Sequence, residues 1–100
     1  MSFEQFMRDD ARLRILQTLR DQSDNRIGDA MLSYALAATG HQRSRDWIRT
    51  QLRAMADLGA VEIVADTPAV MVVELTAAGL DHVTKRGRIE GIKRPEVGEK

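Results

Sequence analysis

The stretch SRDWIRTQLRAMADLGAVEI, residues 44–63, decides the fold because it holds a helix with clear ends and the start of a strand. Ser44 is a favourable N-cap and Gly59 a favourable stop, so a helix is predicted over 45–58. Its hydrophobic residues recur at the i, i+4, i+7 spacing of a helix that buries one side: Ile48, Leu52 and Met55. We expect this helix to pack against a core and to lead directly into a strand.

The sequence around this stretch predicts two helices before it, then a hairpin and a helix after it. The segments VEIVA and VMVVEL are rich in β-branched residues, and ADTPA between them predicts a turn, so together they predict an antiparallel hairpin. Asp29 and Thr76 are predicted N-caps, and Gly40 a left-handed helix end. The predicted elements are helices over 4–22, 30–39 and 45–58, strands over 61–65 and 70–75, and a helix over 77–86, with a polar break over 21–28. The predicted fold class is mainly α with a small β-hairpin.

Length and composition limit what kind of protein this chain can be. One hundred residues, 43% of them hydrophobic, suffice for one domain, which we expect over 1–86 with a polar, loosely ordered tail over 87–100. The chain has no cysteine, which excludes disulfides and thiolate metal sites. It shows no signal-peptide pattern and no apolar run of about 18 residues, so we expect a soluble cytoplasmic protein without a membrane partner.

The residue types that carry catalysis do not gather into a recognisable pattern. There is no Ser/His/acid grouping, no glycine-rich phosphate loop and no pair of acids in a plausible cleft. His41 is expected in a turn and His82 on the last helix, both as solvated surface histidines. The prediction is therefore a protein that is not an enzyme, with no catalytic residue, metal ligand, cofactor or small-molecule substrate.

The order of the predicted elements is similar to that of a known fold. Two short helices with a short connection, followed by a hairpin, resemble a winged helix-turn-helix. In that comparison, residues 44–63 are similar to the recognition helix and first wing strand, and LTAAG, residues 75–79, is similar to the LT-x-x-G that opens the closing helix. The match covers residues 10–86. The whole chain also resembles small, mostly uncharacterised winged-helix proteins of Mu-like phages and prophages, which implies a phage accessory protein or small transcriptional regulator in the cytoplasm of a bacterial host.

A row of arginines on the 45–58 helix is the candidate DNA-binding site. Arg45, Arg49 and Arg53 are spaced i, i+4 and i+8, so we expect them along one exposed face. The resemblance implies that this helix enters the major groove of double-stranded DNA, where arginine pairs with guanine and with phosphates. The candidate residues are Arg45, Arg49 and Thr50 toward the bases, Arg43 and Arg53 toward the backbone, and Ser44 beside them.

Charge and apolar patterning favour an alternative function. Fifteen basic residues balance fifteen acidic ones, and the predicted hairpin carries Glu62, Asp66 and Glu74 without a base, which would repel a phosphate. The hairpin is apolar on both faces, and the first helix is apolar on two sides. The residues of those two stripes are Ala11, Ile15 and Leu19 on one side and Phe6 and Leu13 on the other. The alternative is a protein–protein interaction module without DNA binding, and these surfaces predict a homodimer.

Overall fold

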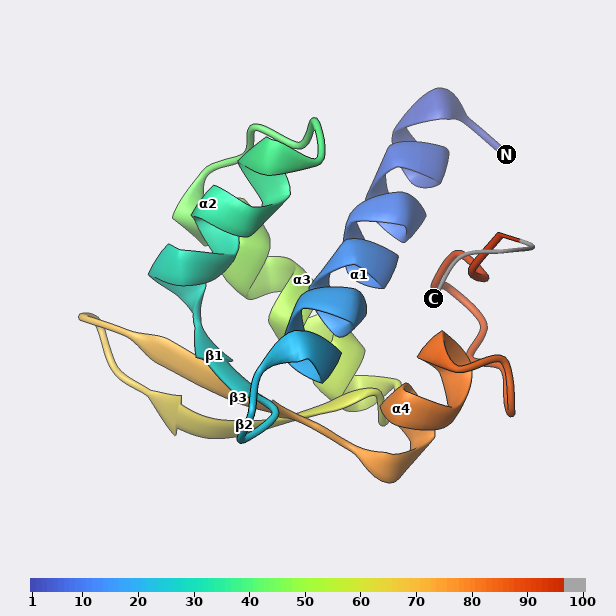
Figure 1. Cartoon of the computed structure of the whole chain (residues 1–100). Helices are drawn as coiled ribbons and strands as arrows, with labels where there is room; N and C mark the ends of the chain where they lie inside the picture. The colour runs from blue at the N-terminus through green and yellow to red at the C-terminus, as the bar shows by residue number, and fades with distance from the viewer. Residues whose placement is uncertain (97–100) are drawn as a thin grey trace.

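The structure, a computed structural model, describes residues 1–96 and has a small α+β fold. Its elements are α1 (Phe3–Asp21), β1 (Arg26–Gly28), α2 (Asp29–Ala38), α3 (Arg45–Asp57), β2 (Val61–Asp66), β3 (Met71–Leu75) and α4 (Ala77–Val83). The strands form one antiparallel sheet in the order β1-β3-β2. Figure 1 shows α1, α2 and α3 grouped on one side of this sheet, with α4 close to its end.

Helix α1 runs through the middle of the core. Leu13, Ile15, Leu16 and Leu19 are fully buried, and they point to more than one side of the helix because α2, α4 and β3 all pack against it. The two apolar stripes predicted on this helix are thus largely covered within the chain itself. Near the N-terminus of α1, the side chain of Phe6 is still exposed.

The ends of the later helices follow the predicted capping. Ser44 Oγ accepts a hydrogen bond from the Trp47 amide at 3.0 Å, and Thr76 Oγ1 accepts one from the Gly79 amide at 3.0 Å. Gly40 ends its helix region with a φ of 93°, in the left-handed region that favours glycine. The predicted α3 and hairpin are confirmed, whereas α4 ends at Val83 rather than at residue 86.

Residues 26–28, predicted as part of a polar break, form the strand β1. Ile27 pairs with Val73 and Gly28 with Val72 along β3. Such a short segment shows no periodicity, and it becomes a strand because the edge of β3, distant in sequence, supplies its hydrogen-bond partners. The prediction of Asp29 as N-cap is also wrong: Gly28 is the N-cap, and Asp29 is the first residue of α2 with a fully buried side chain.

The segment after α4 packs on the body of the protein where the sequence predicts a loose tail. Ile92 is buried in the core cluster. Arg12 of α1 is also buried, and its Nη1 donates a hydrogen bond to the carbonyl of Gly91 at 3.0 Å. A buried guanidinium that binds this backbone fixes the segment against α1. Residues 97–100 of the predicted tail lie outside the described residues.

His82 is buried, so its prediction as a surface histidine is wrong. Its Nδ1 accepts a hydrogen bond from the Ile89 amide at 3.0 Å, and its Nε2 donates one to the carbonyl of Lys93 at 2.9 Å. The imidazole therefore ties α4 to the segment that follows it. Leu80, predicted to face inward, is exposed instead, because α4 turns His82 and Val83 toward the core.

Candidate functional site

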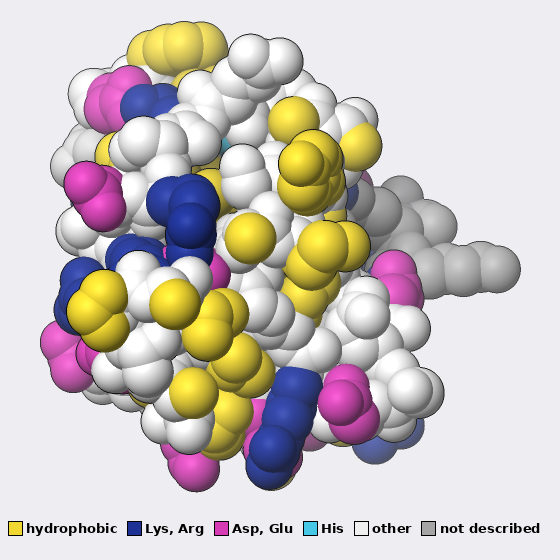
Figure 2. All heavy atoms as spheres, turned by 90° about the vertical axis from the view of Figure 1, so that its left-hand side faces the viewer, with side chains coloured by type: hydrophobic (Ala, Val, Ile, Leu, Met, Phe, Trp, Pro, Cys, Tyr) yellow, Lys and Arg dark blue, Asp and Glu magenta, His cyan; other side chains and the backbone are white. Residues whose placement is uncertain are grey.

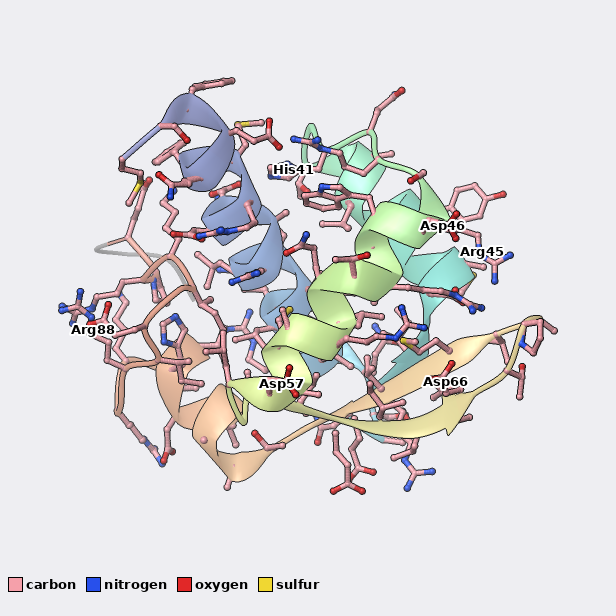
Figure 3. The ribbon with its side chains drawn as sticks, turned by 180° about the vertical axis from the view of Figure 1, so that it is seen from behind. His41, Arg45, Asp46, Asp57, Asp66 and Arg88 are labelled. Carbon is pink, nitrogen blue, oxygen red and sulfur yellow. The ribbon has the colours of Figure 1, made fainter. Side chains whose placement is uncertain are left out.

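Helix α3 lies at the surface with one side in the core and one side open. Figure 3 shows it in front, with Arg45 at its N-terminal end and Asp57 at its C-terminal end. Its apolar stripe is fully buried as predicted, at Ile48, Leu52 and Met55. Of the candidate residues, the structure leaves Ser44, Arg45, Thr50 and Arg53 exposed and Arg43 and Arg49 partly buried.

Two of the candidate arginines share one buried carboxylate. Asp29, at the start of α2, is fully buried, and its Oδ2 accepts hydrogen bonds from Arg49 Nε at 2.5 Å and Arg45 Nη2 at 3.1 Å. Its Oδ1 accepts hydrogen bonds from Arg45 Nη2 at 3.2 Å and from the amide of Met71 at 3.3 Å. A single side chain thus joins α2, α3 and the start of β3.

The cluster of Asp29, Arg45 and Arg49 carries its positive charge mainly at one residue. Burial by itself would raise the pKa of Asp29, but hydrogen bonds from Arg49, the Met71 amide and Arg45 outweigh burial and hold the pKa below its ordinary value of 3.8. Two guanidinium groups on one ionised carboxylate leave one net positive charge. The Arg49 side chain is 13% exposed and that of Arg45 46%, so the surplus charge reaches solvent at Arg45.

The same two arginines hold the tip of the β2–β3 hairpin. Arg49 donates from Nη1 to the carbonyl of Thr67 at 3.0 Å and from Nη2 to that of Pro68 at 3.4 Å. Arg45 donates from Nη2 to the carbonyl of Ala69 at 2.8 Å. The expectation that Arg49 lies on an open helix face is therefore wrong, because Asp29 on one side and the hairpin tip on the other enclose its guanidinium.

The other two candidate arginines have acidic partners at the surface. Arg43 donates from Nη2 to Glu4 Oε1 at 2.8 Å, and its guanidinium lies 4.5 Å from the centre of the Trp47 ring. Arg53 Nη2 lies 3.9 Å from Asp66 Oδ1 on β2. Exposed pairs of this kind contribute only about 0–1 kcal/mol, so another anion can replace the carboxylate at little cost.

A second charged cluster, which sequence reasoning missed, joins three separate segments. His41, predicted as a surface residue, is buried, and its Nε2 lies 2.7 Å from Asp10 Oδ2, while Lys93 Nζ donates to Asp10 Oδ1 at 3.0 Å. The buried Nδ1 of His41 has no hydrogen-bond partner among residues 1–96, and Nε2 is the donor to Asp10, because an ionised carboxylate can only accept. These residues are far apart in sequence, and no local spacing could have indicated the cluster.

The pKa of Asp10 reflects the same balance as that of Asp29. Burial would raise it, but the hydrogen bonds from His41 and Lys93 outweigh burial and hold the pKa below 3.8.

Within the part of the chain that the structure describes, no three metal-binding side chains gather as ligands would. In the same residues, no helix has the length and apolar character to cross a membrane.

Fold and site together define a small α+β protein whose helix α3 carries arginines bound to acidic residues of the same chain. Over 87 residues this chain is 38% identical to the uncharacterised protein gp26 of Escherichia phage Mu, and the match covers 87% of this chain and 88% of that protein. The chain therefore belongs to the family of this phage protein, in agreement with its resemblance to proteins of Mu-like phages. No protein-family model and no solved structure matches the chain.

Proposed function

We propose that the protein is a winged helix-turn-helix protein that binds double-stranded DNA by placing α3 in the major groove. The element order α1-β1-α2-α3-β2-β3 and the strand order β1-β3-β2 support this architecture. The hairpin follows α3 directly, and its tip contacts the first turns of α3 through Arg45 and Arg49. The hairpin would then be the wing beside the recognition helix.

The observation that carries the proposal is the open side of α3. Arg45, Thr50 and Arg53 are exposed along this side, together with Asp46 and Asp57. An α-helix with its side chains is about 10–12 Å across, which fits the major groove of about 12 Å. Arginine side chains at the two ends of this row could reach guanine edges or phosphates while Thr50 lies between them.

The acidic residues near α3 define what kind of DNA binding to expect. Glu4 and Asp66 lie at the surface and pair with arginines of the site, so a phosphate must displace them. The chain has no net charge to attract DNA from a distance. We therefore expect modest affinity that appears at low salt and falls steeply as salt rises.

Fluorescence anisotropy on a labelled random-sequence duplex across a salt series tests this proposal. Arg53→Ala and Arg45→Ala should each reduce the slope of log K against log salt by about 0.9, one lost phosphate contact each. Arg88→Ala is the matched control, because Arg88 lies on the opposite side of the molecule from Arg45 in Figure 3. Absence of binding at low salt, or an equal loss of slope in Arg88→Ala, would refute DNA binding through α3.

A second candidate function, a homodimerisation module, is favoured by the outer face of α2. Met31 is 60% exposed and Tyr34 75%, and Ala30, Ala37 and Ala38 are exposed beside them at helical spacing. Figure 2 shows hydrophobic side chains forming a band across the face of the molecule that includes α2. These five positions carry no charge, so two copies of the face could meet without electrostatic repulsion.

Sedimentation velocity at concentrations on the order of tens of micromolar tests this second candidate. A dimer that dissociates in Tyr34→Glu but persists in Phe3→Glu would place the interface on α2, because Phe3 is an equally exposed aromatic residue on α1. The reverse pattern would place it at the N-terminus of α1. A monomer at all concentrations would exclude the homodimer.

A further inference from the structure

The arginine row of α3 is divided by its contacts into two kinds of residue. Arg49 uses three nitrogens on three separate acceptors: Nε on Asp29, Nη1 on the Thr67 carbonyl and Nη2 on the Pro68 carbonyl. All of these acceptors belong to the protein, and the side chain is mostly covered. Arg49 is therefore already occupied and has little freedom to turn toward a DNA base.

Arg45 makes longer hydrogen bonds to the same carboxylate. Its distances to the oxygens of Asp29 are 3.1 to 3.3 Å, against 2.5 Å for Arg49, and almost half of its side chain is exposed. If Arg45 turns outward to a phosphate, Asp29 keeps the hydrogen bonds from Arg49 and Met71. The carboxylate therefore stays paired when Arg45 leaves.

We propose that Asp29 and Arg49 are positioning residues that hold the hairpin tip against α3, and that Arg45 is the residue of this cluster that contacts DNA. The DNA part of this inference rests on the proposed function. The positioning part concerns the free protein alone. When Arg45 leaves the Ala69 carbonyl for a phosphate, Arg49 still holds the Thr67 and Pro68 carbonyls and Asp29 still holds the Met71 amide, and these contacts determine where the tip lies relative to α3.

Two asparagine variants separate positioning from simple electrostatics. Asp29→Asn and Asp66→Asn each remove one negative charge beside α3, so charge alone would make both bind DNA more tightly. Because Asp66 is exposed and pairs only loosely with Arg53, we expect Asp66→Asn to bind about two- to fivefold more tightly. Asp29→Asn releases the hairpin tip, and we expect it to bind about tenfold more weakly, the opposite sign.

Two lysine variants extend the test without changing net charge. Lysine has a single nitrogen and cannot reach the three acceptors of Arg49, so Arg49→Lys should weaken DNA binding about tenfold while leaving the salt slope unchanged. Arg45→Lys keeps a cation near the phosphate and should retain affinity within about threefold. All affinities are measured at a temperature where circular dichroism shows each variant folded.

Hydrogen exchange of the free protein tests the positioning role independently of DNA. The Met71 amide, which donates to Asp29, should exchange at least about tenfold faster in Asp29→Asn and Arg49→Lys, while the amide of Leu16 in α1 keeps its rate. Unchanged exchange at Met71, or tighter DNA binding by Asp29→Asn, would overturn the inference. If the wild-type protein binds no DNA at low salt, the proposed function fails and the exchange rates alone decide the positioning role.

Discussion

Gly79 lies at a point in α4 where the backbone of another segment leaves no room for a side chain. A Cβ on this residue would lie 2.2 Å from the carbonyl oxygen of Ala60 and 2.9 Å from Leu75 Cδ1. The same turn is fixed by Thr76, whose Oγ1 accepts from the Gly79 amide and donates to the Ala60 carbonyl. The close approach of two backbones therefore explains the glycine in the LTAAG stretch.

We expect Gly79→Ala to lower the free energy of unfolding by about 1–3 kcal/mol, because α4 must move away from Ala60 to admit the methyl group. Urea denaturation followed by circular dichroism measures this loss. Gly87→Ala is the control, since the nearest atom to a Cβ there would be Asp81 Cβ at 3.3 Å. An unchanged stability in Gly79→Ala would show that the contact with Ala60 relaxes freely.

The segment after α4 acts as an additional structural element although it is neither helix nor strand. Ile92 is buried in the core cluster, and Gly91 and Lys93 on either side of it bind α1 through Arg12 and Asp10. The segment therefore closes the core from the side of α1. We therefore expect this segment to contribute to the free energy of unfolding as a buried helix or strand does.

Ile92→Ala should lower the free energy of unfolding by about 2–5 kcal/mol, the usual cost of removing a buried aliphatic side chain. Arg94→Ala, two positions further along and exposed, is the matched control and should stay within about 0.5 kcal/mol of the wild type. Both are measured from urea denaturation curves. Equal stabilities of the two variants would mean that this segment does not support the core.

At the level of elements, the sequence predicts those helices, caps and strands that depend only on residues close together in the chain. The stripe of Ile48, Leu52 and Met55, the cap at Ser44 and the β-branched hairpin are local patterns, and the structure has them at the expected places. Strand β1 depends on an open edge of β3, and the buried state of His82 depends on backbone groups that follow α4. Neither partner has a fixed spacing, so neither could be predicted.

The candidate site also has features that the sequence predicts and features that depend on distant residues. The spacing of the arginines is visible in the sequence, and so is their position on one helix. Which of them is free is decided by Asp29, which lies 16 residues before Arg45 and 20 before Arg49 and looks like an ordinary N-cap. A sequence does not show which backbone carbonyls will bind the arginines, because every residue has a carbonyl.

For the whole molecule, one buried carboxylate, one partly buried carboxylate and one lysine connect segments that are distant in sequence. Asp29 joins α2, α3 and the hairpin, and Asp10 joins α1 to His41 and Lys93. Burial would lower the pKa of Lys93, but its hydrogen bonds to Asp10 and Glu96 outweigh burial and raise the pKa above 10.5. Protonation states at these positions therefore affect the stability of the entire fold.

These shifts predict how stability depends on pH. Asp10 and Asp29 have folded-state pKa values below the ordinary 3.8, so the stability they contribute is present above that pH and is lost as the pH falls through the folded values. Lys93 has a raised pKa, so its contribution is present below 10.5 and is lost as the pH rises through its folded value. Urea denaturation across pH should show losses at both ends. Asp29→Asn should reduce the acid loss and leave the alkaline one intact, and an acid loss unchanged in both Asp29→Asn and Asp10→Asn would contradict this assignment.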